Sequence, residues 1–459
     1  MTQYFPDDFL WGTATASYQI EGASNVDGRG VSIWDTFSKT PGKVVNGDTG
    51  DVACDHYNRF EEDIAIMKDL GVKAYRFSIA WPRLFPEGDD VREERGFAFY
   101  NRLIDALIAA GIEPMVTLYH WDLPQKLEEK GGWASRSIVD SFAKYAMACA
   151  EAFGDRVSNW ITLNEPWCVS WLGYSNGVHA PGKKDFSLAI AAAHHTALSH
   201  AAASRAIKSV RATAQVGITL NMTNNNIEDH NDPEVLAFAQ LSDENLNRWW
   251  IDAFLTGHYP QNLLDTYGDL QKGVIRDGDA ELLKVQTDFL GINYYADGFV
   301  RSARPSDKPY IEGGFMPFPQ RVDTSAPADL ANSLTAMGWV VTPHGLGNLV
   351  TRIHKTWPQI PYLMITENGS SYEDVVLNGE INDVERTEYL TRHLDSLQKA
   401  VADGVPVKGY FAWSLLDNFE WAEGYAKRFG IVHVDYQTLK RTPKSSAKRY
   451  KEIVSTNGL

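Results

Sequence analysis

Apolar residues recur along this chain in one repeated order: a helical spacing, then a glycine, then a nearly continuous apolar run. In the segment "RFEEDIAIMKDLGVKAYRFSIAW", Phe60, Ile64 and Met67 lie three or four positions apart, Gly71 follows them, and an apolar run begins at Ala74. Residues at this spacing share one face of a helix. A glycine just after the last of them is a common signal for the end of a helix. The pattern predicts an amphipathic helix followed by a buried strand.

The same order returns in three further segments, where the helical spacing is followed by Gly111, Gly154 or Gly404. The apolar runs contain few polar residues, as is typical of parallel sheets that helices cover on both faces. Eight candidate strands follow from this pattern: Leu10–Ser17, Ala74–Ala80, Pro114–Tyr119, Trp160–Leu163, Gln215–Asn221, Phe289–Tyr294, Tyr362–Thr366 and Gly409–Ser414.

Eight strands that alternate with helical segments predict an α/β fold, a single (β/α)₈ TIM barrel domain over residues 1–459. A doubly wound sheet is the alternative. It would usually carry a glycine-rich phosphate-binding turn, and the sequence has no G-x-G-x-x-G or P-loop pattern. The segment from Asp297 to Pro343 is too long for a passive connection. Because it follows the sixth strand, we interpret it as a long loop that shapes the rim of an active site.

Composition and charge narrow the classes of partner. The 459 residues are 44% hydrophobic, which allows a large core, and the formal net charge of −16 argues against nucleic acids and anionic membranes as partners. No run approaches the roughly 18 apolar residues of a membrane span, and the N-terminus lacks the features of a secretory signal. The cysteines, Cys54, Cys149 and Cys168, are too few for a disulfide framework. We expect a cytoplasmic protein; the sequence leaves its oligomeric state open.

Polar and aromatic side chains follow each of the eight predicted strands. The strand ends read "SYQIEG", "RFSIAW", "LYHWD", "LNEP", "NMTNN", "NYY", "TENG" and "WSLLDNFEW". Taken singly, a residue such as His120 or Asn293 is more often a hydrogen-bonded core residue than a ligand. A tryptophan such as Trp121 or Trp413 more often packs in the core. Because catalytic groups of this barrel come from the carboxyl ends of its strands, such groups at all eight ends indicate an active site.

Two of these ends, the fourth and the seventh, present a glutamate directly after the apolar run. Glu165 precedes Pro166, which favours an extended backbone at Glu165, and Glu367 precedes an Asn368-Gly369 pair that is typical of a turn. Glycoside hydrolysis needs two carboxyl groups flanking one site. One protonates the leaving oxygen, and the other attacks the anomeric carbon or activates water. The sequence therefore favours a glycosidase.

Other hydrolytic chemistries have little support in the sequence. There is no H-x-H at a strand end, no H-E-x-x-H and no cysteine pair at ligand spacing, so no metal or other cofactor is predicted. His194 and His195 lie in an alanine-rich segment where helix packing is the expected role. A serine nucleophile is not indicated, since no G-x-S-x-G occurs.

Seven motifs, taken together, resemble glycoside hydrolase family 1, the β-glucosidases and their relatives. They are "FLWGTATASYQIEG", "YRFSIAWPRL", "TLYHWDLP", "TLNEPW", "GINYY", "ITENG" and "WSLLDNFEWAEGYAKRFGIVHVDY", in the order of the family and extending from Phe9 to about Tyr450. The resemblance implies a retaining double displacement on terminal β-D-glucosyl residues, with β-galactosides and β-fucosides as further candidate substrates. The substrate would be a small glycoside or an oligosaccharide.

The resemblance also implies roles for individual residues. Glu165 corresponds to the acid/base and Glu367 to the nucleophile, with Arg76 and Tyr295 in contact with Glu367 and Asn293 supporting its surroundings. The physics agrees, because burial and a nearby carboxylate favour a protonated acid whereas a cation and hydrogen bonds favour an ionised nucleophile. By the same matching, the sugar-binding residues are Gln19, His120, Trp121, Asn164, Glu420 and Trp421 for the hydroxyls, Trp413 for stacking and Trp339 on the aglycone side.

Two positions refine the substrate class that the resemblance implies. Family members that cleave 6-phosphosugars typically carry Ser and Tyr where this chain has Glu420 and Phe429, so an unphosphorylated sugar is favoured. Plant thioglucosidases replace the acid/base with Gln, whereas Glu165 is intact. A sugar-binding protein without activity is the alternative from another class. It would be expected to have lost one of the two carboxylates, and both are present.

Overall fold

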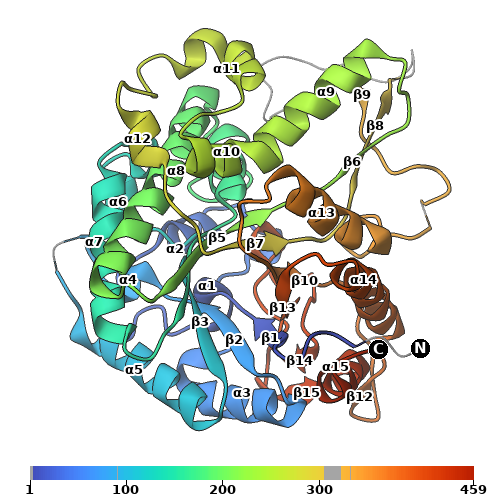
Figure 1. Ribbon diagram of the computed structural model, residues 1–459. Helices are drawn as coiled ribbons and strands as arrows, with labels where there is room; N and C mark the ends of the chain where they lie inside the picture. The colour runs from blue at the N-terminus through green and yellow to red at the C-terminus, as the bar shows by residue number, and fades with distance from the viewer. Residues whose placement is uncertain (1–3, 90, 304–321, 331) are drawn as a thin grey trace.

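The computed structural model describes residues 4–89, 91–303, 322–330 and 332–459, and at its centre is a closed barrel of parallel strands (Figure 1). The barrel strands are β1 (Leu10–Ala14), β2 (Ala74–Ser78), β3 (Glu113–Tyr119), β4 (Asn159–Asn164), β5 (Gln215–Asn221), β7 (Phe289–Asn293), β10 (Leu363–Asn368) and β13 (Val407–Trp413). Each pairs in parallel with the next barrel strand, and β1 closes the ring against β13. The predicted (β/α)₈ fold is confirmed.

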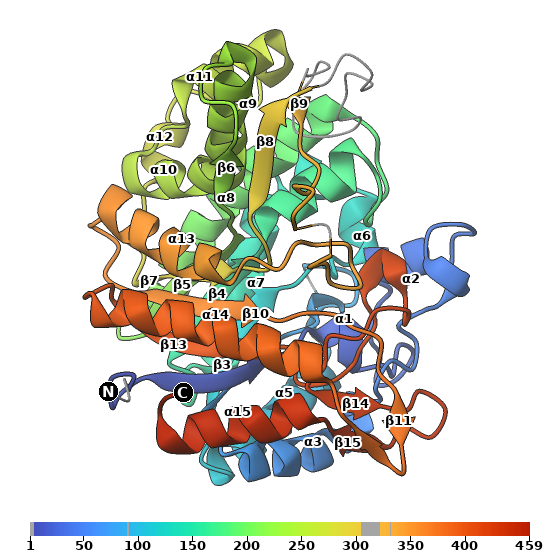
Figure 2. The ribbon, with the colours of Figure 1, turned by 90° about the vertical axis from the view of Figure 1, so that its right-hand side faces the viewer.

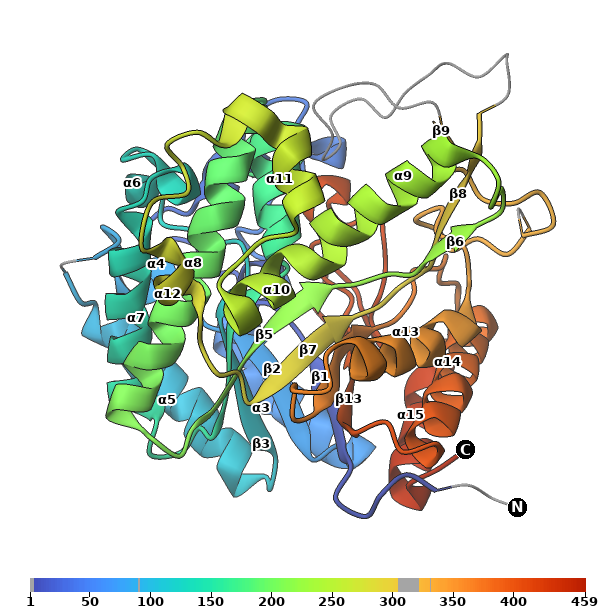
Figure 3. The ribbon, with the colours of Figure 1, turned by 45° about the horizontal axis from the view of Figure 1, so that its top comes forward.

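Helices surround the barrel, as Figure 3 shows. The longer ones are α3 (His56–Leu70), α5 (Glu94–Ala109), α7 (Ile138–Phe153), α8 (Phe186–Val210), α9 (Pro233–Asp243), α10 (Trp249–Thr256), α13 (Pro343–Thr356), α14 (Val384–Ala402) and α15 (Ser445–Thr456). Gly71, Gly111 and Gly404 follow α3, α5 and α14 with the left-handed backbone (φ 76°, 74° and 92°) that a glycine stop supplies. The predicted glycine signals thus mark real helix ends.

Short helices lie mostly in the loops between these elements. They are α1 (Ser17–Ile20), α2 (Ile33–Ser38), α4 (Trp81–Leu84), α6 (Gln125–Glu128), α11 (Gln261–Tyr267), α12 (Asp279–Leu283), η1 (Val45–Gly47), η2 (Gly132–Ala134), η3 (Cys168–Ser175), η4 (Glu244–Arg248), η5 (Gly268–Gln271) and η6 (Trp421–Glu423). No helix among the described ranges is long and apolar enough to cross a membrane.

The interior of the barrel changes from apolar to polar along the strands. Alternate residues of a strand point to the same side, so Ala74 and Arg76 share one side of β2, and Phe289 and Asn293 share one side of β7. Ala74 and Phe289 belong to a buried apolar cluster contributed by the barrel strands. The polar residue of each pair lies nearer the carboxyl end of its strand. In both strands, the buried polar group therefore lies toward the carboxyl-terminal mouth of the barrel.

The segment from Asp297 to Pro343 contains strands that the sequence pattern missed. β8 (Gly298–Ser302) pairs with β6 (Asn225–Ile227) and with β9 (Val322–Asp323), which makes a small three-stranded sheet beside α9 (Figure 2). Residues 304–321 and 331 of the predicted rim loop lie outside the described residues. Two further pairs of short strands are β11 (Val376–Leu377) with β12 (Glu380–Ile381) and β14 (Val432–Val434) with β15 (Arg441–Pro443). Tyr4, near the start of the described chain, bridges to Gly458, so the first and last described segments lie side by side (Figure 1).

Most strand ends differ from the prediction by a few residues, and two of these differences bear on the site. β1 ends at Ala14, and Ser17 to Ile20 form α1, so Gln19 lies on a helix rather than just after a strand. β10 continues through Asn368, so the predicted Asn368-Gly369 turn is wrong. The buried Asn368 side chain donates to the Tyr294 carbonyl (2.7 Å) and accepts from the Tyr410 hydroxyl (2.8 Å).

Gly369 serves close packing rather than a turn. Its backbone is not left-handed, but a Cβ atom at this position would lie 1.7 Å from the carbonyl oxygen of Trp413. Only glycine lets β10 leave the barrel this close to the end of β13.

Candidate active site

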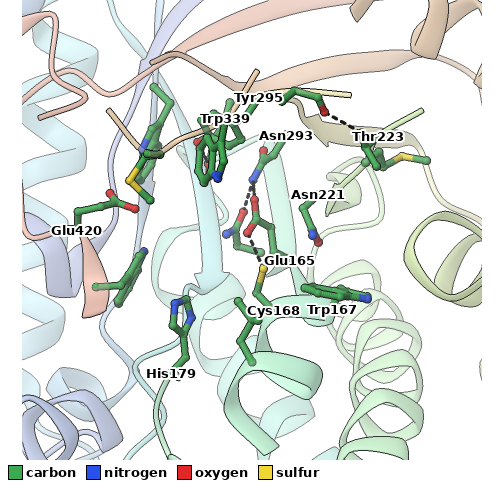
Figure 4. Close-up of a pocket in the computed structure, with 18 of the residues that line it drawn as sticks. Glu165, Trp167, Cys168, His179, Asn221, Thr223, Asn293, Tyr295, Trp339 and Glu420 are labelled. Carbon is green, nitrogen blue, oxygen red and sulfur yellow. Dashed lines mark hydrogen bonds between the residues drawn. The ribbon is translucent and has the colours of Figure 1, made fainter. Parts of the chain in front are cut away.

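A cavity of about 570 Å³ lies at the carboxyl-terminal mouth of the barrel. Its volume falls in the range of small-molecule sites, about 300–1,000 Å³. Figure 4 shows side chains from several barrel strands converging on it. Twelve residues singled out in the sequence line the cavity: His120, Trp121, Asn164, Glu165, Asn293, Tyr295, Trp339, Glu367, Trp413, Glu420, Trp421 and Phe429. Arg76 and Gln19 lie behind this lining, and both are wholly buried.

Glu367, at the end of β10, is held by a cation and a phenol. Arg76 Nη1 donates to its Oε1 over 2.6 Å, and the Tyr295 hydroxyl donates to its Oε2 over 2.6 Å. Burial raises the pKa of Glu367, while the Arg76 charge and the Tyr295 hydrogen bond act in the opposite direction. Because an arginine stays protonated even when buried, Arg76 supports the ionised form of Glu367.

Glu165 has a different set of partners. Asn293 Nδ2 donates to Oε1 over 2.6 Å, and Cys168 Sγ lies 3.2 Å from Oε2. No cation forms an ion pair with Glu165 among the described residues. Burial, and then the charge of Glu367, raise the pKa of Glu165 to about 7. Glu165 is therefore the carboxyl group of this pair that holds a proton near neutral pH.

The backbone at Glu165 contradicts the prediction from Pro166. Glu165 has a left-handed φ of 46°, and Pro166 begins a helical segment that continues into η3. Proline suits the first position of a helix, because its missing N–H has no partner there in any case. The extended backbone predicted for Glu165 is wrong, and the helix that begins beside it brings Cys168 back to the carboxyl group.

One arginine determines how three neighbouring side chains are oriented. Arg76 Nη2 donates to Asn164 over 2.6 Å, so the atom of Asn164 at this contact is its oxygen. The same oxygen accepts from Asn293 Nδ2 over 3.0 Å, and the Asn164 amide nitrogen then faces His120 Nε2 at 3.0 Å. His120 Nε2 is therefore an acceptor.

The protonation of His120 follows from this contact and from burial. Burial, followed by the charge of Arg76, lowers the pKa of His120 well below its ordinary value, so the ring is neutral. With Nε2 accepting, the single ring proton lies on Nδ1. That atom is buried and has no hydrogen-bond partner in the described part of the chain.

Unpartnered polar atoms mark one side of the site. Besides His120 Nδ1, they include Gln19 Oε1 and Glu420 Oε2, both buried. Gln19 is held by hydrogen bonds from its Nε2 to Asn418 Oδ1 (3.0 Å) and the Phe419 carbonyl (2.8 Å), next to Glu420. A buried polar atom without a partner is costly. These three groups lie at predicted sugar-binding positions, where a hydroxyl-rich ligand would satisfy them.

Glu420 is the third carboxyl group at the cavity. Burial, and then the charges of Glu367 and Glu165, raise the pKa of Glu420 to about 8. The raised pKa values of Glu165 and Glu420 indicate that this mouth disfavours further negative charge, which agrees with the predicted preference for an unphosphorylated sugar.

Aromatic rings form most of the remaining wall. The His120 ring stacks on Trp413 (centroids 5.8 Å apart) and on Trp421 (5.8 Å), while Trp339 and Phe429 both pack against Tyr295. The indole N–H of Trp121 donates to the Asn164 carbonyl over 2.9 Å. A sugar hydroxyl bound to Trp121, as predicted, would have to share this N–H with the carbonyl.

Several residues of the site escaped the sequence reasoning. Thr366 donates to Asn293 Oδ1 over 2.8 Å and Thr117 accepts from Arg76 Nε over 3.1 Å, so both orient groups that contact the two glutamates. Cys168 and His179 line the cavity. A signal for Cys168 existed, since it lies three residues after Glu165 and one helical turn would bring the two together. The extended backbone predicted at Glu165 from Pro166 concealed it.

No group of three or more His, Cys, Asp or Glu side chains suitable for holding a metal ion occurs in the part of the chain that the structure describes. His194, which the sequence assigned to helix packing, is buried on α8 and contacts the Tyr259 hydroxyl (2.7 Å) and Asp279 (2.8 Å). His195 contacts the Trp133 carbonyl over 2.9 Å. Both are structural partners away from the cavity.

A (β/α)₈ barrel with two unequally held carboxyl groups at its mouth is the arrangement expected of a glycoside hydrolase. Comparison with known proteins names the group within that class. The family model "Glycosyl hydrolase family 1" matches residues 1–459. The chain belongs to this family, as the seven motifs indicated.

Relatives and solved structures agree with this assignment. The chain is 45% identical to β-glucosidase A of Acetivibrio thermocellus, with 99% of each chain covered. It is 43% identical to a bifunctional β-D-glucosidase/β-D-fucosidase of Bifidobacterium breve, again with 99% of each covered. A solved family 1 β-glucosidase from Thermotoga maritima superposes with a TM-score of 0.92 at 45% identity, covering all of both chains.

Proposed function

We propose that this family 1 enzyme hydrolyses terminal β-D-glucosyl residues with retention, Glu367 acting as nucleophile and Glu165 as acid/base. One observation carries the assignment of roles: Arg76 and Tyr295 hold Glu367, whereas Asn293 and Cys168 are the described side chains that donate to Glu165. The nucleophile must be ionised and the acid must carry a proton, and these surroundings supply that difference.

The first half of the reaction forms a glycosyl-enzyme. A carboxylate oxygen of Glu367 attacks the anomeric carbon while the bond to the leaving oxygen breaks, and Glu165 transfers its proton to that oxygen. Glu367 becomes an ester and loses its charge. Because that charge contributes to the raised pKa of Glu165, the pKa of Glu165 falls.

The second half reverses these roles. Glu165, now a carboxylate, takes a proton from the incoming water, whose oxygen bonds to the anomeric carbon as Glu367 leaves. Two inversions at one carbon return the β configuration. Arg76 and Tyr295 stabilise the negative charge that returns to Glu367.

Sugar recognition follows from the unpartnered atoms. Glu420 Oε2 and Gln19 Oε1 would accept from sugar hydroxyls, and His120 Nδ1 would donate to one. Trp413 offers an aromatic face for the ring, and Trp339 lies on the aglycone side. The Bifidobacterium breve relative supports β-fucosides as additional substrates. The three free, buried cysteines support a reducing, cytoplasmic location.

Azide rescue tests the roles of the two glutamates. Glu367→Ala with azide is expected to release an α-glycosyl azide, because azide attacks directly from the face that the nucleophile has vacated. Glu165→Ala with azide is expected to release the β-glycosyl azide, with its largest rate loss on poor leaving groups. A matched control is Glu128→Ala: Glu128 is also buried but contacts Tyr174 outside the cavity. Azide should change nothing in this variant.

Mechanism-based labelling supplies an independent test. A 2-deoxy-2-fluoroglucoside with a good leaving group is expected to trap the ester, and peptide mapping should place the label on Glu367. A label on another residue, or α product from Glu165→Ala, would refute the assignment. An absence of turnover on every aryl β-glucoside would favour the sugar-binding alternative.

A further inference from the structure

The thiol of Cys168 lies next to the carboxyl group of Glu165. It lies three residues further along the chain, where η3 begins, and its Sγ is 3.2 Å from Glu165 Oε2 (Figure 4). The side chain is only 7% exposed and lines the same cavity as the two glutamates. The thiol thus meets one of the carboxyl groups of the reaction directly.

The two oxygens of Glu165 are not equivalent. Asn293 presents N–H to Oε1, and this orientation follows from Arg76 through Asn164. An amide N–H only donates. A carboxyl proton on Oε1 would therefore find no hydrogen-bond acceptor at Asn293 Nδ2. The acidic proton therefore belongs on Oε2. Of the described side chains, Cys168 alone has a hydrogen bond to Oε2.

Building on the proposed role of Glu165, we propose that Cys168 is a positioning residue for the acid/base, its S–H holding Oε2 at the leaving-group side and stabilising the carboxylate form. In the first half-reaction, the proton on Oε2 moves to the leaving oxygen. The thiol then donates a hydrogen bond to the new carboxylate while its S–H bond stays intact. In the second half-reaction, Oε2 takes a proton from water, and the thiol retains its hydrogen throughout.

The thiol is a donor here and not a nucleophile. Burial, and then the charge of Glu165, raise the pKa of Cys168 well above its ordinary value. A thiol that stays protonated reacts poorly but remains available for hydrogen bonding. The same contact lowers the pKa of Glu165, which favours the base over the acid.

Other charged or titratable groups also face Glu165. They come from β2, from β10 and from the segments that follow β7 and β13: Arg76, Glu367, Tyr295 and Glu420. A substitution at Cys168 leaves all four in place. A change in the pH dependence can then be assigned to the loss of the donor.

The test compares a donor-free variant with a donor-retaining one. Cys168→Val removes the S–H at similar volume, and Cys168→Ser keeps a hydroxyl donor. In Cys168→Val, the alkaline limb of kcat/KM is expected to move up by about half a pH unit, because the protonated acid persists to higher pH. The acid limb for reactivation of the trapped 2-fluoroglucosyl-enzyme should also move up, because that step needs the carboxylate. Cys168→Ser should keep both limbs near their original positions.

Controls separate this role from packing. Cys149→Val replaces a wholly buried thiol on α7 that does not line the cavity, and both limbs should stay in place. A purely structural role for Cys168 would lower the rate at every pH without moving either limb. Should Cys168→Val fold poorly by circular dichroism, Cys168→Ala removes the donor with less steric demand.

Several outcomes would overturn the inference. Unmoved limbs in Cys168→Val or Cys168→Ala would do so, as would equal shifts in Cys168→Val and Cys168→Ser. Glu165→Gln distinguishes this failure from failure of the proposed function. If Glu165→Gln shows no extra loss on poor leaving groups, the role of Glu165 itself is wrong. If that loss is present and the limbs do not move, only the role of Cys168 is wrong.

Discussion

Arg76 donates a 2.6 Å hydrogen bond to Asn164, and this contact orders the polar groups on both sides of the cavity. Through it, Asn164 presents its oxygen to Asn293 and its nitrogen to His120. Arg76 also pairs with Glu367 over 2.6 Å. One wholly buried cation therefore orients Glu367, the proposed nucleophile, and, through Asn164, both Asn293 and His120.

Arg76→Met should lower kcat/KM at least about 100-fold, because it removes preorganised charge from Glu367, the proposed nucleophile. The Arg76 charge opposes the effect of burial on Glu367, so its loss raises the pKa of that carboxyl. The acid limb of the pH profile should therefore move to higher pH. Steady-state kinetics on an aryl β-glucoside across pH would measure both effects.

Arg83→Met is the matched control for Arg76. Arg83 is also wholly buried and pairs with Glu21 (3.0 Å) away from the cavity. Arg83→Met should lower the free energy of unfolding by about 3–5 kcal/mol, as much as Arg76→Met does. The acid limb of its pH profile should stay in place. An equal shift in both variants would contradict the role given to Arg76.

His120 should be neutral between about pH 5 and 8, with its proton on Nδ1, because burial lowers its pKa and Nε2 accepts from Asn164. Two-dimensional ¹⁵N–¹H spectra of the histidine-labelled protein distinguish the two tautomers directly. The difference from a His120→Gln spectrum would assign the signal among the 12 histidines. A proton on Nε2, or titration within this range, would be incompatible with the orientation inferred from Arg76.

Lys444→Met should destabilise the fold by about 3–5 kcal/mol, because it leaves two buried carboxylates without their shared cation. Lys444 Nζ contacts Asp374 (2.5 Å) and Asp417 (2.7 Å), and these residues follow β10 and β13. Lys448→Met is the control, since its pair with Glu380 is exposed and 3.5 Å long, and it should change stability by less than about 0.5 kcal/mol. Denaturant unfolding would measure both.

The pH dependence of this loss has a definite sign. Burial raises the pKa of Asp417, but the charges of Lys444, Arg428 and Arg386 outweigh it, so the pKa is lowered in the folded protein. A group with a lowered folded pKa stabilises the protein above its unfolded pKa, and that contribution disappears as the pH falls through the folded value. The deficit of Lys444→Met should be largest near neutral pH and should shrink below about pH 4. A deficit that grew on acidification would argue against this network.

Gly369→Ala should reduce kcat/KM by at least about 10-fold and destabilise the protein by about 1–3 kcal/mol. The added Cβ would meet the Trp413 carbonyl at 1.7 Å and displace Glu367, two residues away, or Trp413 itself. Gly379→Ala is the control: it lies between β11 and β12 with φ 82° and no atom within 4 Å of an added Cβ. It should cost about 1 kcal/mol of left-handed strain and leave kcat/KM unchanged. A normal kcat/KM in Gly369→Ala would show that the Trp413 carbonyl can move away from the added Cβ atom without disturbing the site.

The sequence by itself determined the barrel, the mouth and the two glutamates. Helical spacing, glycine and apolar run are local patterns, because a helix stripe and a buried strand each need only neighbouring residues. Parallel strands closed into a barrel place their carboxyl ends at one mouth, so Glu165 and Glu367 fall together although 202 positions separate them. The family motifs then named the residues around them.

Only the tertiary structure decided how these groups are held. Arg76 and Glu367 are 291 positions apart, and no local pattern states which oxygen meets which nitrogen. The structure also reversed two local readings: Pro166 starts a helix, and Gly369 allows close packing rather than a turn. A residue's backbone preference is worth about a kilocalorie per mole and yields to packing and buried hydrogen bonds. The position of Cys168 against Glu165 Oε2 became visible only once that helix was in place.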